Sequence, residues 1–297
     1  MRIVSLLLVV AFGCSSSRRA ERSADTPQVP GDTALLATVS IAKLRASTAW
    51  PRLETAILSR LPIDKVKTKC GFDPLQTIET ISLAAPAEFH PERMIVYARG
   101  VERGAVDACA KTLTAAQNHL VTIKDENKLV AYRESDKAMF AAWLDPRTIA
   151  VTPGDLGARD RLQLLVDKPQ PTSAAFTEQS SKMASGHTLA FAFVAPPETD
   201  MLAFVAETGV EPMAGHGWLD LDSALRGEIA LRFESAGRAA TVVQDITKRI
   251  AADTSPMGSV LRGVHATANG SDVVIAVQLD QAATDQLISL LMSGTPN

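Results

Sequence analysis

Several features that mark specialised functions are scarce in this sequence. Aromatic residues make up 5% of its 297 residues, which leaves few rings for stacking on bases or sugars. Basic and acidic residues nearly balance, at 30 against 33, and no long block of one sign occurs. A nucleic-acid partner is therefore not expected, because such binding needs a concentrated positive charge. The hydrophobic fraction of 46% is that of an ordinary globular chain with a substantial core.

Sequence motifs with a defined chemical mechanism are also missing. There is no Gly-x-Gly-x-x-Gly, no phosphate-binding loop and no Gly-x-Ser-x-Gly. Ser40 and Lys43 have the Ser-x-x-Lys spacing of penicillin-binding enzymes, but no Lys-Thr-Gly follows, so Ser40 is predicted to cap a helix. No pair of histidines has metal-ligand spacing among His90, His119, His187, His216 and His265. The sequence thus predicts no catalytic residue, no metal and no cofactor.

One histidine has unusual neighbours. His216 lies between Gly215 and Gly217, and Asp220 and Asp222 follow it. Glycines allow a close approach of the backbone to another group, so this stretch is a candidate ligand site. The alternative, which we favour, is a loop leading into a strand whose aspartates face water.

Long apolar runs are missing except near the N-terminus. Ile3–Phe12 is apolar apart from Ser5, it follows a positively charged start, and Gly13 precedes Cys14. This three-part order is that of a secretory signal. As a helix, ten or eleven residues rise about 16 Å, roughly half of the ~30 Å hydrocarbon core of a bilayer. The run is therefore too short for an uncleaved membrane anchor.

The stretch Ala11-Phe12-Gly13-Cys14 resembles the lipid-attachment site of bacterial lipoproteins. This resemblance covers the first fourteen residues and implies a signal peptide over residues 1–13 and a diacylglycerol on Cys14, usually with a third acyl chain. It implies anchoring on the periplasmic side of the cell envelope, because two or three chains hold a protein on a membrane nearly permanently. Some Gram-negative lipoprotein families carry, directly after the cysteine, an aspartate that retains them in the inner membrane. This chain has Ser15 there, so the resemblance favours the outer membrane of a Gram-negative bacterium. The alternative is an ordinary signal peptide in which Cys14 carries no lipid.

The residues after the cysteine predict a tether. Residues 14–31 have no apolar periodicity and are rich in Ser, Arg and Pro, which is typical of a disordered segment. A flexible tether would let the folded body stand clear of the membrane surface without leaving it.

Two cysteines remain once Cys14 is assigned to a lipid. In an oxidising periplasm, Cys70 and Cys109 are candidates for a disulfide that closes a loop of about 40 residues. Two separate buried thiols are the alternative, since Cys109 falls on the apolar face of a helix predicted from Arg103 to His119.

The body alternates helical and strand patterns, which predicts an α+β fold. We expect two similar halves, residues 32–166 and 174–297, each a mainly antiparallel sheet with helices packed on one face. The Pro-containing stretch 167–173 is the predicted linker, and a cleft between the halves is the default binding place. The halves align over one helix each, with three pairs 137 positions apart: Val106, Cys109 and Leu113 opposite Val243, Ile246 and Ile250.

Two local patterns are especially clear. Alternating runs on both sides of Asn269-Gly270 predict a hairpin over residues 263–280. A helix is predicted over residues 197–208, with Pro197 at its start.

Together these features favour a lipid-anchored, exported protein without enzymatic activity. Its predicted role is to bind an unknown envelope protein or a small apolar ligand, or to serve as a structural component of the envelope. Two alternatives stay open. One is a cell-envelope hydrolase whose catalytic residues are dispersed in the sequence, and the other is a periplasmic assembly factor or chaperone.

Overall fold

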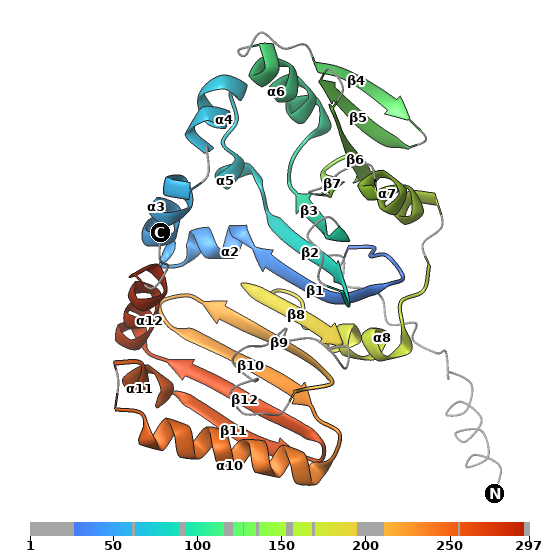
Figure 1. Cartoon of the computed structure of the whole chain (residues 1–297). Helices are drawn as coiled ribbons and strands as arrows, with labels where there is room; N and C mark the ends of the chain where they lie inside the picture. Colours follow the sequence, from blue (N-terminus) through green and yellow to red (C-terminus); the bar gives the residue numbers. More distant parts are fainter. Residues whose placement is uncertain are drawn as a thin grey trace, which may run out of the picture.

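Runs of alternating apolar and polar residues form β-strands that join into one twelve-stranded sheet in this computed structural model (Figure 1). The structure describes residues 27–60, 63–88, 93–115, 121–126, 128–134, 137–152, 157–167, 170–194, 211–254 and 256–293. Its strands are β1 (Thr33–Ser40), β2 (Thr80–Pro86), β3 (Ile95–Arg99), β4 (Val121–Glu126), β5 (Leu129–Glu134), β6 (Lys137–Asp145), β7 (Thr148–Val151), β8 (Leu189–Val194), β9 (Ala214–Leu221), β10 (Leu225–Arg232), β11 (Val264–Asn269) and β12 (Asp272–Leu279).

The helices lie between the strands in the chain. They are α2 (Ile41–Ala46), α3 (Trp50–Arg60), α4 (Ile63–Cys70), α5 (Pro74–Thr77), α6 (Arg103–Ala115), α7 (Gly157–Asp167), α8 (Ala174–Ser181), α10 (Ala236–Ala252), α11 (Pro256–Leu261) and α12 (Gln281–Ser293). Ser40 is the N-cap of α2, as predicted, and its side chain accepts a hydrogen bond from the Lys43 N–H. Within the described residues, no helix combines the length and the hydropathy that a membrane crossing requires.

The strand order is β11-β12-β10-β9-β8-β1-β2-β3-β7-β6-β5-β4, and all neighbouring strands are antiparallel. The sequence predicted a separate sheet in each half, and this prediction is wrong. Strands β1 and β8 pair from Leu35 opposite Phe193 to Val39 opposite Leu189. This pairing satisfies backbone groups that would be left free at the edges of two smaller sheets. The halves are therefore hydrogen-bonded along their junction, where a cleft was expected.

Helices cover both faces of the sheet, which corrects the prediction that they pack on one face only (Figure 1). Neighbouring residues of a strand point to opposite faces. Leu36 of β1 belongs to a core that includes Leu165 of α7 and Phe176 of α8, whereas Leu35 packs in a core with Val242 of α10. Helices α7 and α8 thus cover one face and α10 covers the other.

Helix α6 lies on the same face as α10. Tyr97 of β3 points into the core under α7 and α8, while the adjacent Ala98 packs with Val106 of α6. This places α6 over the strands of the first half and α10 over those of the second.

The predicted hairpin near the C-terminus is confirmed, with one detail changed. Strands β11 and β12 pair from Val264 opposite Val277 to Asn269 opposite Asp272. The turn is Gly270-Ser271, so Asn269 is the last residue of the strand, and Gly270 has φ +60°. A positive φ is a conformation that glycine adopts without a steric cost.

The chain is already packed before β1, so the predicted tether ends earlier than residue 31. The Gln28 side-chain amide donates to the Leu165 carbonyl at 2.7 Å, Val29 packs against the core under α7 and α8, and Pro30 is buried. Two apolar residues next to a helix gain more from burial than from exposure to water. The predicted signal peptide, Cys14 and the helix over 197–208 lie outside the described residues.

Candidate functional site

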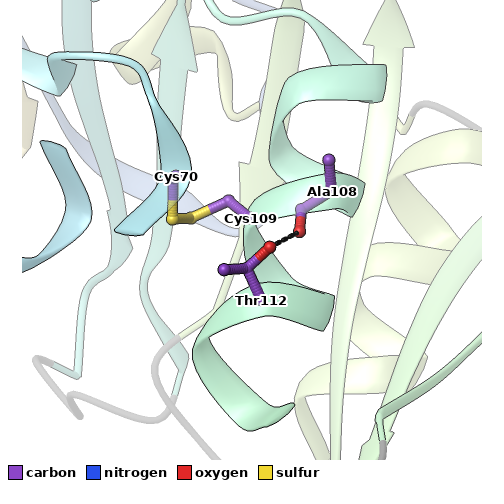
Figure 2. The surroundings of a disulfide bond; sticks show 4 residues. All are labelled: Cys70, Ala108, Cys109 and Thr112. Carbon is purple, nitrogen blue, oxygen red and sulfur yellow. Dashed lines mark hydrogen bonds between the residues drawn. A yellow bond between two sulfur atoms is a disulfide. The ribbon is translucent and has the colours of Figure 1, made fainter. Parts of the chain in front are cut away.

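The two remaining cysteines meet at one end of the first half. Figure 2 shows Cys70, the last residue of α4, bonded to Cys109 of α6, with Cα atoms 4.6 Å apart. The bond holds α4 against α6, on which Cys109 itself is buried. The end of α4 is thus fixed to α6.

A pocket of about 430 Å³ lies next to α6, one of the two helices that the disulfide joins. Its walls come from the segment after α4, from α5, from the N-terminal half of α6 and from the ends of β2 and β3. The size is within the range typical of small-molecule sites. Its lining residues are Arg45, Phe72, Gln76, Thr77, Glu79, Gly100, Val101, Glu102, Ala105, Val106 and Arg147.

One wall of this pocket is polar and held in place by hydrogen bonds. Arg147 donates to the Glu79 carboxylate at 2.7 Å, and Arg99 lies 3.7 Å from the other oxygen of that carboxylate. Arg45 donates to the main-chain carbonyls of Leu75 and Ile78. These charged groups keep fixed positions, which suits recognition of a ligand without rearrangement.

The floor of the pocket depends on one glycine. Gly100 has φ +106°, and a Cβ atom there would lie 2.4 Å from the Thr77 carbonyl oxygen. Any larger residue would push the end of β3 away from α5. The apolar side chains of Phe72, Val101 and Val106 complete the lining, so the pocket offers charged and apolar contacts to the same ligand.

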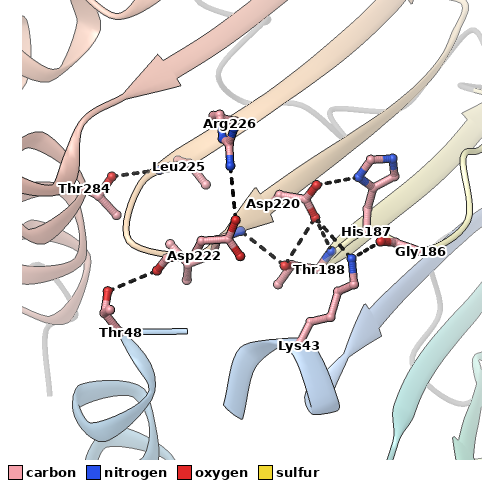
Figure 3. A network of polar contacts seen from close by, with 11 residues as sticks. Lys43, Thr48, Gly186, His187, Thr188, Asp220, Asp222, Leu225, Arg226 and Thr284 are labelled. Carbon is pink, nitrogen blue, oxygen red and sulfur yellow. Dashed lines mark hydrogen bonds and ion pairs between the residues drawn. The ribbon is translucent and has the colours of Figure 1, made fainter. Parts of the chain in front are cut away.

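A second polar cluster lies where the two halves join (Figure 3). His187 Nδ1 is 2.8 Å from Asp220 Oδ2, and the Thr188 N–H donates to Asp220 Oδ1 at 2.9 Å. Lys43 of α2 donates to the Gly186 carbonyl, and its ammonium is 4.0 Å from the Asp220 carboxylate. The cluster therefore connects α2 with the start of β8 and the end of β9.

The carboxylate at the centre of this cluster is stabilised in its charged form. Partial burial by itself would raise the pKa of Asp220. The hydrogen bonds from His187 and from the Thr188 N–H, together with the charges of His187 and Lys43, outweigh that effect and lower the pKa below its ordinary value. Asp220 therefore remains an acceptor for His187 at mildly acidic pH.

A histidine held by an aspartate through Nδ1 is the arrangement that orients a general base. In addition, the imidazole ring of His187 stacks on the ring of Trp218, with ring centroids 4.2 Å apart. In the part of the chain that the structure describes, no hydroxyl or thiol is hydrogen-bonded to His187. The geometry therefore fits a structural junction between the halves better than acyl-transfer chemistry.

Sequence reasoning did not single out this pair. His187 and Asp220 are 33 positions apart, and only the pairing of β8 with β9, which sets Leu189 opposite Leu219, brings them together. The arginines and Glu79 of the pocket were missed for the same reason. Separation along the chain gives no information on such distances.

His216 does not lie in a loop, as the sequence suggested. It belongs to β9, and its Nδ1 is 2.9 Å from the side-chain oxygen of Gln179 in α8. Burial and the charge of Lys182 lower its pKa below the ordinary value, more than the acidic residues nearby raise it. Gly215 is needed for packing, since a Cβ there would lie 2.7 Å from the ring of Phe193. The close approach predicted at these glycines is thus made by an aromatic side chain.

No group of three or more metal-ligating side chains occurs in the described ranges of the chain. His216 is hydrogen-bonded to an amide and His187 to a single carboxylate, which is the setting of structural histidines.

Comparison with known proteins identifies a fold and not a family. No family description matches the sequence, and no curated protein matches it significantly. A solved structure described as "Structure of crystal form I of TP0453" is similar, with a TM-score of 0.51 over 92% of this chain and 98% of that chain. The two sequences are 11% identical over this length. The likeness extends over the large antiparallel sheet and its helices, and it concerns the fold alone.

Proposed function

We propose that this chain is a lipid-anchored protein of the bacterial cell envelope whose folded body binds a ligand without catalysis. The observation that carries the binding role is the preformed pocket between α5, α6 and the ends of β2 and β3. The proposed anchor is a diacylglycerol on Cys14, on the periplasmic side of the outer membrane, as the resemblance of residues 11–14 to lipoproteins implies.

The packing of the N-terminal residues bears on how the body would be held. Because Gln28 is hydrogen-bonded to α7, the thirteen residues 15–27 would separate Cys14 from that contact with the body. A flexible segment of that length has an average reach of roughly 19 Å. The body would then stay close to the membrane surface while keeping some freedom to turn.

Replacing Cys14 by serine tests the anchor. We expect Cys14→Ser to abolish incorporation of radiolabelled palmitate and to move the protein from the membrane fraction to the soluble fraction, or to leave the leader uncleaved. Two or three acyl chains hold a protein on a membrane nearly permanently, so their loss has a large effect. Ser16→Ala, two residues away, is the control and keeps both properties. A Cys14→Ser protein that still carries palmitate and stays on the membrane would refute the anchor.

The pocket itself favours a ligand that carries both an apolar part and an anionic group. Phe72, Val101 and Val106 supply the apolar surface, and Arg45 and Arg147 line the same space. A small apolar molecule was expected from the sequence. The lining also carries Glu79 and Glu102, and Arg147 is paired with Glu79. Arg45, which donates to main-chain carbonyls, is therefore the group that favours the addition of an acidic part to the ligand. Anilinonaphthalene sulfonate has this combination and is a suitable fluorescent probe.

We expect Ala105→Trp to weaken binding of that probe at least tenfold. Ala105 is exposed on α6 and lines the pocket, so an indole there fills the space without removing a core contact. Ala108→Trp is the matched control, because Ala108 is exposed on the same helix but is not part of the lining. Fluorescence titration measures both. Equal affinities of the two variants would show that the probe binds elsewhere.

We also propose that the two halves arose by duplication. Support comes from the order of the sheet, in which β1, β2 and β3 follow one another outward from the junction, as do β8, β9 and β10 on the other side. A helix on the same face comes next in each half, α6 in one and α10 in the other. Superposing the two units should bring the Cα atoms of Val106, Cys109 and Leu113 onto those of Val243, Ile246 and Ile250.

A further inference from the structure

Among the residues that the structure describes, no strand pairs with the outer edge of β11. In an antiparallel pair, alternate residues direct their N–H and C=O toward the partner strand. The hairpin closes at Asn269 opposite Asp272, and the Gln278 N–H donates to the Gly263 carbonyl at 2.8 Å. Counting from these two points, the backbone groups of Val264, Ala266 and Ala268 point away from β12, toward the free edge of the sheet.

The two ends of the sheet are protected to different degrees. The opposite edge strand, β4, carries Lys124, Asp125 and Glu126, and charged side chains are a common device that prevents an edge from pairing. The sequence of β11, Val-His-Ala-Thr-Ala-Asn, has no lysine, no acidic residue and no proline. Its edge is therefore open to pairing with another strand.

A groove of about 1090 Å³ follows this edge. Its lining includes Val264 and Ala266, which point to the face covered by α10, and also His265 and Thr267, which point to the other face. A groove lined by both faces of a strand lies at the edge of the sheet itself. The far wall comes from α10, which runs alongside β11 in Figure 1, and from α11; the wall residues are Thr247, Ile250, Ala251, Asp253, Thr254, Gly258 and Arg262.

We propose that this groove binds an extended peptide segment of a partner protein, which adds to the sheet as a thirteenth strand next to β11. Main-chain hydrogen bonds to Val264, Ala266 and Ala268 would hold the segment. Its alternate side chains would face Ile250 and Ala251 of α10 on one side, and water on the other. An apolar–polar alternation is therefore the expected sequence pattern.

Charge adds a second requirement for the partner. Arg262 is exposed at the start of β11 and forms no ion pair with the residues that the structure describes. An acidic side chain at the corresponding end of the segment would complement it.

A second copy of this chain fits the same edge less well. Each copy would bring its own α10 to the junction, and both helices would have to occupy the space in which the grooves lie. The edge is also short, since six residues extend over roughly 20 Å, which provides little area for a stable dimer. A single peptide segment avoids both restrictions because it enters the groove without a folded body beside it.

The test uses a phage-displayed library of random 12-residue peptides against the full chain purified from membranes in detergent. We expect enrichment of peptides with alternating apolar and polar residues and an acidic residue near one end. Synthetic copies should slow hydrogen exchange in residues 264–269. Ala266→Pro should weaken their binding at least tenfold, because it removes an outward N–H that the incoming strand needs but leaves the bonds between β11 and β12 in place.

Two further variants keep the result interpretable. Asn269→Thr changes an exposed side chain at the end of the same strand that does not line the groove, and it should bind the peptides as the parent does. Arg262→Glu is a surface change that should weaken the acidic peptides at least tenfold even if Ala266→Pro reduces stability. Failure to enrich any peptide, or equal binding by Ala266→Pro and the parent, would overturn the proposal. So would a dimer in sedimentation experiments that Ala266→Pro dissociates, because the occupant would then be a second copy.

Discussion

Removing the disulfide is expected to lower the free energy of unfolding by about 4 kcal/mol. The bond between Cys70 and Cys109 closes a loop of about 40 residues, and in the chain-entropy model most of the effect comes from the freedom that the unfolded chain regains. Serine suits position 70, and alanine suits Cys109 because that side chain is 7% exposed. Guanidinium titration followed by circular dichroism measures the difference between Cys70→Ser/Cys109→Ala and the parent.

The reduced parent is the control for this prediction. With a strong reductant present, its denaturation midpoint should fall to nearly that of the double variant, since both proteins then lack the cross-link. A small difference should remain, because the reduced parent keeps the two cysteine side chains that the double variant has lost. A midpoint that responds neither to the substitutions nor to the reductant would show that the two sulfurs are not bonded in the protein. Faster hydrogen exchange in α4 and α6 should accompany the loss, because the bond fixes these two helices to each other.

The second large effect is expected at Phe176. This side chain is 1% exposed, and it lies in the core under α8 together with Leu36 of β1 and Ile95 of β3. Removing a buried phenyl ring costs about 3–5 kcal/mol, because the lost burial and the remaining cavity both destabilise the fold. Phe176→Ala should therefore lower the free energy of unfolding by that amount, as measured by the same titration. Phe176→Leu, which keeps most of the volume, should cost much less.

The position of Phe176 makes it a test of cooperativity between the halves. Helix α8 follows the predicted linker and so belongs to the second half in sequence, yet its phenyl ring packs on strands of the first half. We expect Phe176→Ala to raise hydrogen-exchange rates equally in β5 and β6 and in β10 and β12, far from the substitution on either side. Faster exchange in one group alone would mean that the halves unfold separately.

The sequence predicted the secondary structure correctly where contacts between residues close in the chain determine it. The hairpin β11–β12 follows from two alternating runs and a turn, and α10 follows from its helical periodicity, because residues close in the chain make these contacts. The four strands from Val121 to Val151 were predicted for the same reason. The pattern at Cys14 is also local, although the lipid that it implies remains a prediction.

The arrangement of these elements required the tertiary structure. A strand has two edges, and its sequence does not state which other strand will satisfy each of them. The junction of β1 with β8 joins residues 150 or more positions apart, and it turns the two expected sheets into one. The packing of helices on both faces likewise depends on the complete sheet, because α7 and α8 pack on an apolar surface that exists only once the strands are assembled.

The candidate sites show most clearly which features follow from the sequence and which require the tertiary structure. The sequence supplied Cys70 and Cys109 as a candidate pair, but the pocket beside α6 depends on Arg45, Glu79 and Arg147, which come from three distant segments. The pair of His187 and Asp220 and the open edge of β11 likewise exist only once the strands are ordered. Composition and periodicity determine which elements form, because their energies depend on near neighbours in the chain. Sites depend on distances between remote residues, and those are set only when the whole sheet has assembled.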